Sequence, residues 1–235
     1  MDAIILAAGK GTRLLPHTKD TPQCLLPVGG KPMLQHQAEA LKKAGIKGIT
    51  VIGGYLAAKV ETYAKSLGLH FILHPFFDVS GNALTLWSAK EEMKQGCIFL
   101  YSDIIFEETI IRDLLKEKGD IILLIAKDNL RDESEKVVEG DGKIISISKD
   151  NKKGQNGEFT GIVSLSKKGA SQLIEALGEL AKTSINVSMI EVFSAMLAKG
   201  IEIKACDVKK AHYVDVDFPQ DVEKAEKMLR GFKRS

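Results

Sequence analysis

Short apolar segments alternate with amphipathic ones along the first half of the chain. Asp2–Ala7 and Cys97–Tyr101 are apolar almost throughout, which is typical of strands that are buried on both faces. The other expected elements are strands at Gly48–Ile52, Leu69–Leu73 and Asp120–Ala126, and helices at Pro32–Ala44, Leu56–Leu67, Asn82–Met93 and Glu107–Lys118. This alternation predicts an α/β fold with a mostly parallel sheet and helices on both faces.

The pattern changes after Ala126. Two short runs, Lys136–Val138 and Lys143–Ser148, flank Gly140-Asp141-Gly142, and this arrangement predicts a β-hairpin. The remaining expected elements are strands at Phe159–Leu165, Ile201–Val208 and His212–Val216, and helices at Lys168–Leu180, Ile185–Lys199 and Pro219–Leu229. We expect one domain over residues 1–235, with a core at 1–128 and, at 129–235, a smaller lid-like part that ends in the last helix.

The balance of charge narrows the class of partner. The 235 residues contain 33 Lys and Arg against 31 Asp and Glu, a formal net charge of +2, which argues against a nucleic-acid-binding surface as the main function. Cys24, Cys97 and Cys206 lie far apart, and their odd number is typical of a reducing compartment. The N-terminus lacks the basic segment of a signal peptide, and no apolar run reaches membrane-spanning length. We therefore expect a cytoplasmic protein with neither a membrane nor a nucleic-acid partner.

A glycine-rich turn follows the first strand, at Leu6-Ala7-Ala8-Gly9-Lys10-Gly11-Thr12-Arg13. Small residues in such a turn let backbone N–H groups approach phosphate closely. The turn lacks the Gly-Lys-Ser/Thr end of a Walker A loop, and Leu14 stands where a dinucleotide fingerprint needs a small residue. Gly9 and Asp103 both follow strands, so a parallel sheet would bring them to its carboxyl edge, where ligands bind.

A second segment reads Asp20-Thr21-Pro22-Gln23-Cys24-Leu25-Leu26-Pro27-Val28 and continues as Gly30-Lys31-Pro32-Met33-Leu34. With the glycine-rich turn, it resembles the sugar-phosphate nucleotidyltransferase superfamily, whose pattern is LAAGxGTR followed by TPKxLLPVxGKPxL. Asp103 after a core strand and Asp217-Phe218-Pro219-Gln220-Asp221 before the last helix extend the similarity over nearly the whole chain. The resemblance implies a Rossmann-like α/β domain with a small substrate-binding lid. It also implies an enzyme that uses Mg²⁺, joins a nucleotide from an NTP to a small phosphorylated substrate and releases pyrophosphate.

The resemblance implies roles for the residues of the turn. Gly9 and Gly11 would wrap the phosphates of the nucleotide, and Arg13 would hold the leaving β- and γ-phosphates, which a guanidinium can grip with two hydrogen bonds. The alternative for Arg13 is a solvated loop charge. The nucleotide-binding residues implied in this way are Leu6, Ala7, Ala8, Gly9, Gly11, Thr12, Arg13, Gly54, Asn82 and Thr85.

Carboxylates would hold the metal. By resemblance Asp103 and Asp217 bind Mg²⁺, a cation that prefers carboxylate and phosphate oxygens, although each can also be an ordinary turn or helix-capping residue. Asp215 is expected to face away from Asp217 and is ranked below it. Lys149, with Asp103, is a candidate for binding the acceptor, and the alternative for Lys149 is one of many surface lysines in a polar loop.

Gln23 departs from the family pattern, which has Lys at this position. The family lysine contacts the transferred and the incoming phosphates, and losing one preorganised charged donor costs roughly 10²–10³ in rate. Gln23 is thus a natural variation compensated by another cation, an engineered change, or a mark of a weakly active relative that mainly binds nucleotide. The acceptor's own phosphate would be the nucleophile, so no histidine is required. The five histidines are interpreted as loop or surface residues: His17, His36, His70, His74 and His212.

The segment from Ser80 to Ala89 bears on the substrates. It resembles the N-x-x-S/T-L-x-x-A of the small cytidylyltransferases that act on phosphocholine, 2-aminoethylphosphonate or inositol phosphate, and Gly53-Gly54-Tyr55-Leu56 is also similar to theirs. The resemblance therefore favours CTP and a small phosphorylated alcohol as substrates. Asn82 can also be a helix N-cap, and the two interpretations are compatible. The alternative activities are a sugar-1-phosphate uridylyl-, thymidylyl- or guanylyltransferase and nucleotide binding without turnover. A homodimer is left open.

Overall fold

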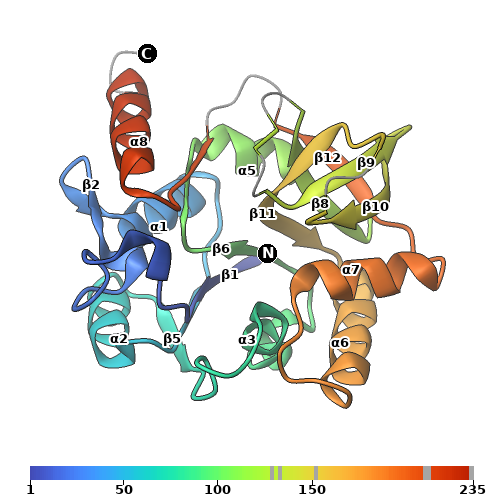
Figure 1. Ribbon diagram of the computed structural model, residues 1–235, viewed down its shortest axis with the longest axis horizontal. Helices are drawn as coiled ribbons and strands as arrows, with labels where there is room; N and C mark the ends of the chain where they lie inside the picture. The colour runs from blue at the N-terminus through green and yellow to red at the C-terminus, as the bar shows by residue number, and fades with distance from the viewer. Residues whose placement is uncertain (128–129, 132–133, 151–152, 209–212, 233–235) are drawn as a thin grey trace. The chain divides into compact units, whose positions relative to one another are not determined.

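A computed structural model describes residues 1–127, 130–131, 134–150, 153–208 and 213–232. The chain forms two compact units that interleave along the sequence. The loop unit comprises Asp2–Asp78, Leu100–Asp113 and Lys210–Ser235, and the hairpin unit comprises Met1, Val79–Phe99 and Leu114–Lys209. Both units combine β-strands with helices (Figure 1), so the predicted α/β class is confirmed.

The loop unit contains parallel strands in the order β5-β4-β1. β1 (Asp2–Ala7) pairs with β4 (Ile49–Gly53), which pairs with β5 (His70–Leu73). The two helices that connect these strands are α1 (Met33–Lys43) and α2 (Ala57–Ser66). A glycine with positive φ follows each helix, as the sequence predicts. Because these strands pair in parallel, their carboxyl ends lie at a common edge.

Two small antiparallel pairs complete the loop unit. β2 (Pro27–Val28) and β3 (Lys31–Pro32) form a hairpin, and β7 (Ile104–Phe106) pairs with β13 (Tyr213–Asp215). The remaining elements are η1 (Thr12–Leu14), η2 (Gln23–Leu25), α8 (Pro219–Phe232) and α5 (Glu108–Leu114), whose last residue falls in the hairpin unit. An apolar cluster holds these pieces together: Leu14, Leu26, Val28, Met33, Ile105, Val216 and Ala225. Burial of this cluster fixes the chain on both sides of the acidic residues that follow β13.

The hairpin unit has the strand order β11-β8-β12-β10-β9, and β9 also pairs with β11. β8 and β12 are parallel, whereas the other pairs are antiparallel. The strands are β8 (Ile121–Ala126), β9 (Lys136–Gly140), β10 (Lys143–Ser148), β11 (Gly157–Leu165) and β12 (Lys204–Asp207). The predicted hairpin is confirmed, because Asp141 and Gly142 form a two-residue turn with φ of 51° and 75°.

The helices of the hairpin unit are α3 (Asn82–Trp87), α4 (Lys90–Met93), α6 (Lys167–Ala181) and α7 (Met189–Ala198). One continuous helix over Asn82–Met93 was the expectation, and it was wrong. Ala89, with φ of −105° and ψ of 30°, interrupts the helix between α3 and α4. β6 (Cys97–Tyr101), with the bounds expected from the sequence, runs from the hairpin unit into the loop unit. Among the described helices, none has the length and apolarity to cross a bilayer.

Candidate active site

The glycine-rich turn leaves β1 at the carboxyl edge of the loop unit. Leu6, Ala7 and Ala8 are buried, whereas Gly9 and Thr12 are exposed. The two neighbouring connections meet this turn, because Ser102 N donates to Leu6 O at 3.1 Å and Tyr55 N donates to Ala8 O at 3.0 Å. The structure therefore places the ends of β1, β4 and β6 together, as the parallel pattern predicts.

The structure requires glycine at some positions of this edge but not at others. Gly11 has φ of 61°, and a Cβ there would stand 2.7 Å from Gln23 Oε1, so only glycine fits the folded chain. Gly54 lies against Ala8 and Phe77, where a Cβ would come within 2.5 Å of the Phe77 side chain. Gly9 has open space at its Cβ position. Packing within the described chain therefore does not require glycine at position 9.

A carboxylate cluster lies in the same unit. Asp103, Asp215 and Asp217 each have a carboxylate oxygen within 4.8 Å of those of the other two. Asp103 and Asp217 thus lie close enough to share one cation, as expected. Backbone pairing builds the cluster: Ile104 stands opposite Asp215 in the β7–β13 pair, and Val216 N donates to Asp103 O at 2.7 Å.

The expectation that Asp215 faces away from Asp217 was wrong. Side chains alternate along extended backbone, so residues two positions apart share a face. Asp215 ends β13 and Asp217 follows it by two positions, with the buried Val216 between them pointing into the apolar cluster. The D-x-D spacing itself was the signal for this third carboxylate.

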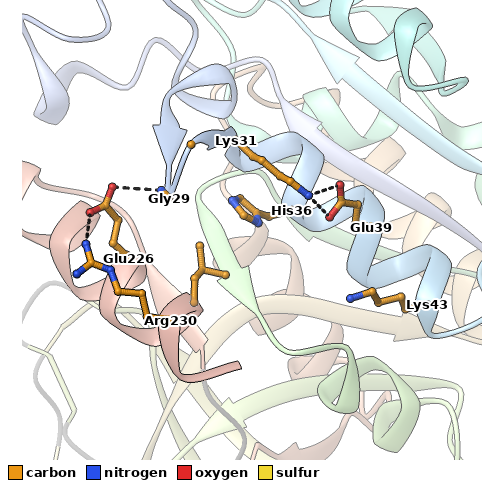
Figure 2. Close-up of a pocket in the computed structure, with 9 residues that line it drawn as sticks. Gly29, Lys31, His36, Glu39, Lys43, Glu226 and Arg230 are labelled. Carbon is orange, nitrogen blue, oxygen red and sulfur yellow. Dashed lines mark hydrogen bonds and ion pairs between the residues drawn. The ribbon is translucent and has the colours of Figure 1, made fainter. Parts of the chain in front are cut away.

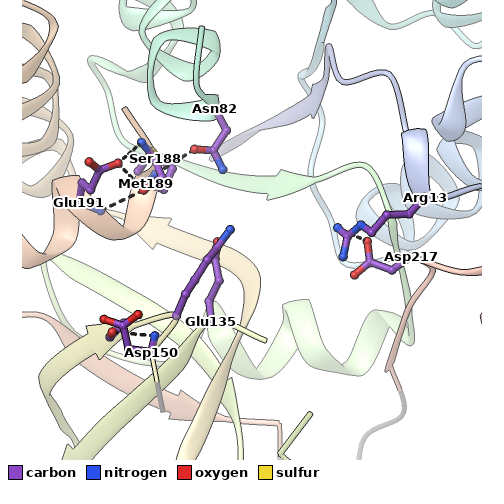
Figure 3. Close-up of polar contacts among 10 residues, drawn as sticks. Arg13, Asn82, Glu135, Asp150, Ser188, Met189, Glu191 and Asp217 are labelled. Atoms are coloured by element: carbon purple, nitrogen blue, oxygen red, sulfur yellow. Dashed lines mark hydrogen bonds and ion pairs between the residues drawn. The ribbon is translucent and has the colours of Figure 1, made fainter. Parts of the chain in front are cut away.

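Within the cluster, Asp103 has a strongly shifted pKa. Burial raises its pKa well above the usual value, and the neighbouring charges of Asp215 and Asp217 raise it further. Arg13 acts in the opposite direction. Its guanidinium contacts Asp217 Oδ1 at 2.6 Å (Figure 3) and also lies 5.5 Å from the centroid of the Phe218 ring. The cluster thus holds more negative charge than Arg13 alone offsets.

Gln23 connects the glycine-rich turn with the acidic segment. Its side chain lies against Gly11, and its Nε2 donates to Val216 O at 3.0 Å. The residue that replaces the family lysine is therefore beside both groups that the resemblance assigns to phosphate and metal. Its amide contributes a hydrogen bond but no charge at this point.

Asn82, Thr85 and Lys149 belong to the hairpin unit. Asn82 is the first residue of α3 and Gly81 is the N-cap, so the interpretation of Asn82 as the N-cap of this helix was wrong. The Asn82 Oδ1 atom instead accepts a hydrogen bond of 2.8 Å from Met189 N at the start of α7 (Figure 3). Thr85 is buried, with its hydroxyl 3.5 Å from Gly81 O.

Close packing of two backbone segments places Asn82. A Cβ on Gly81 would stand only 2.0 Å from Val187 O, and Ala83 N donates to Val187 O at 3.2 Å. Glycine at 81 therefore lets the start of α3 lie against the start of α7. This contact joins residues about a hundred positions apart and could not be seen in a local pattern.

Lys149 follows β10 and is exposed. Its Nζ lies 3.8 Å from a carboxylate oxygen of Glu135, which is largely buried. The neighbouring Asp150, which Figure 3 shows near Glu135, has a backbone N that donates to Ser148 Oγ at 3.0 Å. Lys149 is thus an exposed cation weakly paired with one acid, and its assignment to the acceptor stays a prediction.

The histidines only partly match the sequence interpretation. His17 and His70 are exposed. His74 lies in the loop after β5, as expected, but it is buried, and burial lowers its pKa. His36 lies in α1, half-buried, and its Nε2 is 2.8 Å from Val28 O. His212 lies outside the described residues. The three cysteines are buried and form no disulfide, and burial raises the pKa of Cys24 to about 12.

A glycine-rich turn and a carboxylate cluster at the carboxyl ends of parallel strands define the class: an α/β protein that handles a phosphorylated ligand beside acidic side chains. The sequence model of one family, the MobA-like NTP transferase domain, matches residues 3–184. The chain belongs to this family, and nucleotidyl transfer is its class of reaction. The resemblance drawn from the sequence motifs is confirmed.

Individual relatives agree with this family assignment. The chain is 28% identical to a CTP:phosphoglutamine cytidylyltransferase of Campylobacter jejuni, over 95% of this chain and 98% of the relative. It is 30% identical to a bifunctional IPC transferase and DIPP synthase of Aquifex aeolicus over 97% of its own length, which spans 51% of that relative.

Two solved structures share the fold. They are the CTP:phosphocholine cytidylyltransferase of Streptococcus pneumoniae and the inositol-1-phosphate CTP transferase of T. maritima, with TM-scores of 0.80 and 0.82 and sequence identities of 22% and 23%. The alignments cover 97% and 98% of this chain and 98% and 96% of those chains, respectively.

Proposed function

We propose that the chain transfers the cytidylyl group of CTP to a small phosphorylated alcohol and releases pyrophosphate. The segment Ser80–Ala89 and the names of three relatives matched over nearly the whole chain support cytidine as the base, because those three are named as CTP-using transferases. Their acceptors are different phosphorylated small molecules, which supports the acceptor class but not one compound.

One observation carries this proposal. The loop unit holds the glycine-rich turn, Arg13 and the acidic cluster within contact of one another, with Arg13 paired to Asp217 at 2.6 Å. Transfer of a nucleotidyl group needs donors for the phosphates and acids for a cation at the same place, because the charge that develops lies on both the α-phosphate and the leaving group. A protein that only bound a nucleoside would need neither.

The proposed reaction is a direct displacement. An oxygen of the acceptor phosphate forms a bond to the α-phosphorus of CTP while the bond from that phosphorus to the oxygen bridging to the β-phosphorus breaks. The bridging oxygen keeps the electron pair and leaves as pyrophosphate. The acceptor phosphate has a second pKa of about 6, so it is already dianionic near neutral pH and needs no general base. The chain's contribution is positioning and charge stabilisation.

Side chains and backbone of the loop unit divide this work. N–H groups of the glycine-rich turn bind the triphosphate, and Arg13 holds its leaving end. Gln23, beside Gly11 and Val216 O, donates toward the phosphates where they meet. In this proposal Leu6, Ala7 and Thr12 shape the turn. Gly54, Asn82 and Thr85 contact the nucleoside, and Lys149 binds the acceptor.

The acidic cluster fits Mg²⁺. Its donors are carboxylate oxygens, the ligands that this cation prefers, and three carboxylates stand within 4.8 Å of one another. Asp103, Asp215 and Asp217 are the residues that would hold the ion. When bound, it supplies positive charge beside the α-phosphate and the pyrophosphate.

The test is a pyrophosphate-release screen of CTP, UTP, GTP and ATP against phosphocholine, inositol phosphate, 2-aminoethylphosphonate and glucose 1-phosphate. We expect release with CTP and one phosphorylated alcohol or phosphonate. Release with UTP or GTP and the sugar phosphate would instead assign the sugar-phosphate branch. Binding of nucleotide without release in any combination would favour the weakly active relative that Gln23 suggests.

A further inference from the structure

A pocket of about 540 Å³ lies in the loop unit (Figure 2), and no residue of the acidic cluster lines it. α1, the β2–β3 hairpin and α8 form its walls. Its volume is within the range of about 300–1,000 Å³ that is typical of small-molecule sites. None of the residues assigned above to nucleotide, metal or acceptor lines it.

Positive charge exceeds negative charge in the lining. Lys31, Lys43 and Arg230 face Glu39 and Glu226. Lys31 Nζ contacts both carboxylate oxygens of Glu39, at 2.8 and 2.9 Å, and Arg230 Nη2 lies 3.6 Å from Glu226. Within the described part of the chain, the ammonium group of Lys43 has no such partner, and Figure 2 shows it directed into the space between α1 and α8. The pocket thus presents one uncompensated cation.

Specific contacts hold the walls in place. Gly29 N donates to Glu226 Oε1 at 3.2 Å, which ties the hairpin to α8. His36 Nε2 donates to Val28 O at 2.8 Å, since a carbonyl oxygen can only accept. Gly29 and Gly30 form the hairpin turn with φ of 59° and 86°, a geometry that suits a tight two-residue turn. The pocket is therefore set by side-chain and backbone contacts from three elements.

We propose that this pocket binds a small phosphorylated compound separate from the substrates of the reaction. Its phosphate would lie at Lys43, and its hydroxyl or amino groups would donate to Glu39 and Glu226. His36 also lines the pocket. A mixed lining of cations and carboxylates favours such a ligand over an apolar one.

Binding at this place would act on α8. This helix contributes Glu226, Leu229 and Arg230 to the pocket and begins at Pro219, two positions after Asp217. Leu229 also packs on the apolar cluster that contains Val216. A ligand that bridges α1 and α8 therefore stabilises the helix that leads directly from the acidic segment.

The experiment is a titration of the ¹⁵N-labelled full chain with inorganic phosphate, followed by amide chemical shifts at constant ionic strength. We expect saturable changes in the amide chemical shifts of Gly30 and residues 226–230. We also expect the amide hydrogens of α8 to exchange more slowly. Lys43→Gln should weaken this binding by about threefold or more, because it removes one charge pair. Lys43→Arg should restore it. Lys47→Gln, an exposed lysine near the same helix and outside the pocket, is the matched control.

Other outcomes overturn the proposal. Shifts confined to Gly9, Gly11 and their neighbours would mean that phosphate binds only at the glycine-rich turn. If Lys43→Gln binds phosphate as tightly as the wild type and keeps a wild-type-like amide spectrum, the pocket is excluded as the phosphate site. Equal binding of acetate and phosphate would exclude a phosphate-selective site. Each readout is independent of catalytic activity, so it does not depend on the proposed reaction.

Discussion

Arg13 and Asp217 neutralise each other in the chain without ligands. Their contact of 2.6 Å joins the residue expected to hold the leaving phosphates with a residue expected to hold the metal. For both proposed roles, Arg13 must contact the phosphates and Asp217 must contact the metal when nucleotide binds. The ion pair between them must therefore break or take in these new partners. Arg13 is exposed, whereas Asp217 is buried, and a half-exposed pair of this kind is worth only about 1 kcal/mol or less. Exchange of partners is thus energetically accessible.

Gln23→Lys should raise turnover, by up to roughly 10²–10³ if no other cation fills the role. Two phosphates meet beside this residue, and a Lys would offset their repulsion. Lys can also keep the hydrogen bond to Val216 O that Gln23 makes. The measurement is kcat and KM for both forms with the best substrate pair.

The KM for nucleotide should change less than kcat, since the added charge acts mainly as the phosphates meet. Gln23→Ala, which removes the hydrogen bond without adding charge, is the control. An unchanged kcat in Gln23→Lys would show that another cation, such as Lys149, already serves.

Asp215→Asn should stabilise the metal-free chain near neutral pH and reduce its stabilisation by Mg²⁺. The variant removes one of the charges that raise the pKa of Asp103. Each 1 kcal/mol is worth about 2–4 °C in Tm for a chain of this size. Tm measured with and without Mg²⁺ checks both signs. A lower Tm without metal, or an unchanged response to Mg²⁺, would contradict the role given to Asp215.

The effect of pH on stability follows from the direction in which the pKa of Asp103 is shifted. Its pKa in the folded chain lies above the unfolded value. Its contribution to stability is therefore fully present below the unfolded pKa and is lost as pH rises through the folded pKa. The difference in Tm between Asp215→Asn and wild type should narrow as pH falls from 7 toward the ordinary Asp range.

The glycine-rich turn offers a contrast between two alanine substitutions. Gly11→Ala should destabilise the chain by about 1–3 kcal/mol, because alanine is strained at positive φ and its Cβ would overlap Gln23. Gly9→Ala should leave Tm unchanged but raise the KM for nucleotide by about tenfold, equal to ~1.4 kcal/mol. Open space at the Gly9 Cβ position is the reason. Wild-type KM in Gly9→Ala would argue against phosphate contact there.

Asn82 joins α3 to α7, and its two proposed roles can be separated. Asn82→Ala should lower stability by about 1 kcal/mol, because Met189 N loses its acceptor. Asn82→Asp keeps an acceptor oxygen and should retain Tm. If Asn82 also contacts the nucleotide through its amide nitrogen, Asn82→Asp should lower kcat/KM at unchanged Tm. Wild-type Tm in Asn82→Ala would remove the structural role.

Local patterns predicted most of the elements. The bounds of β6 and the turn at Asp141–Gly142 follow from apolar runs and turn residues alone. The second hairpin, β2–β3, was missed because its strands have only two residues each. Long-range contacts were also invisible: the pairing of β7 with β13 brings Asp103 to Asp215, and no local pattern reports it. The site could be placed at a sheet edge from the sequence, and the D-x-D spacing could have indicated its third acid, but its ion pair could not be predicted.

At the scale of the whole molecule, the residues proposed to contact the substrates belong to both units. The loop unit carries the glycine-rich turn and the acidic cluster, and the hairpin unit carries Asn82, Thr85 and Lys149. The units interleave, so the expected boundary between a core at 1–128 and an acceptor part at 129–235 stays a prediction. The central claim is that the chain performs one displacement at the α-phosphorus of CTP.

³¹P NMR of the reaction tests this claim most directly. CTP, Mg²⁺ and phosphocholine, or the acceptor found in the screen, are incubated with the chain, and an acceptor labelled with ¹⁸O on its phosphate is used in parallel. We predict equal amounts of pyrophosphate and a CDP-linked product, with ¹⁸O in the new bridge between the two phosphorus atoms. Pyrophosphate formed with CMP and no linked product, or an unlabelled bridge, would contradict the proposed transfer.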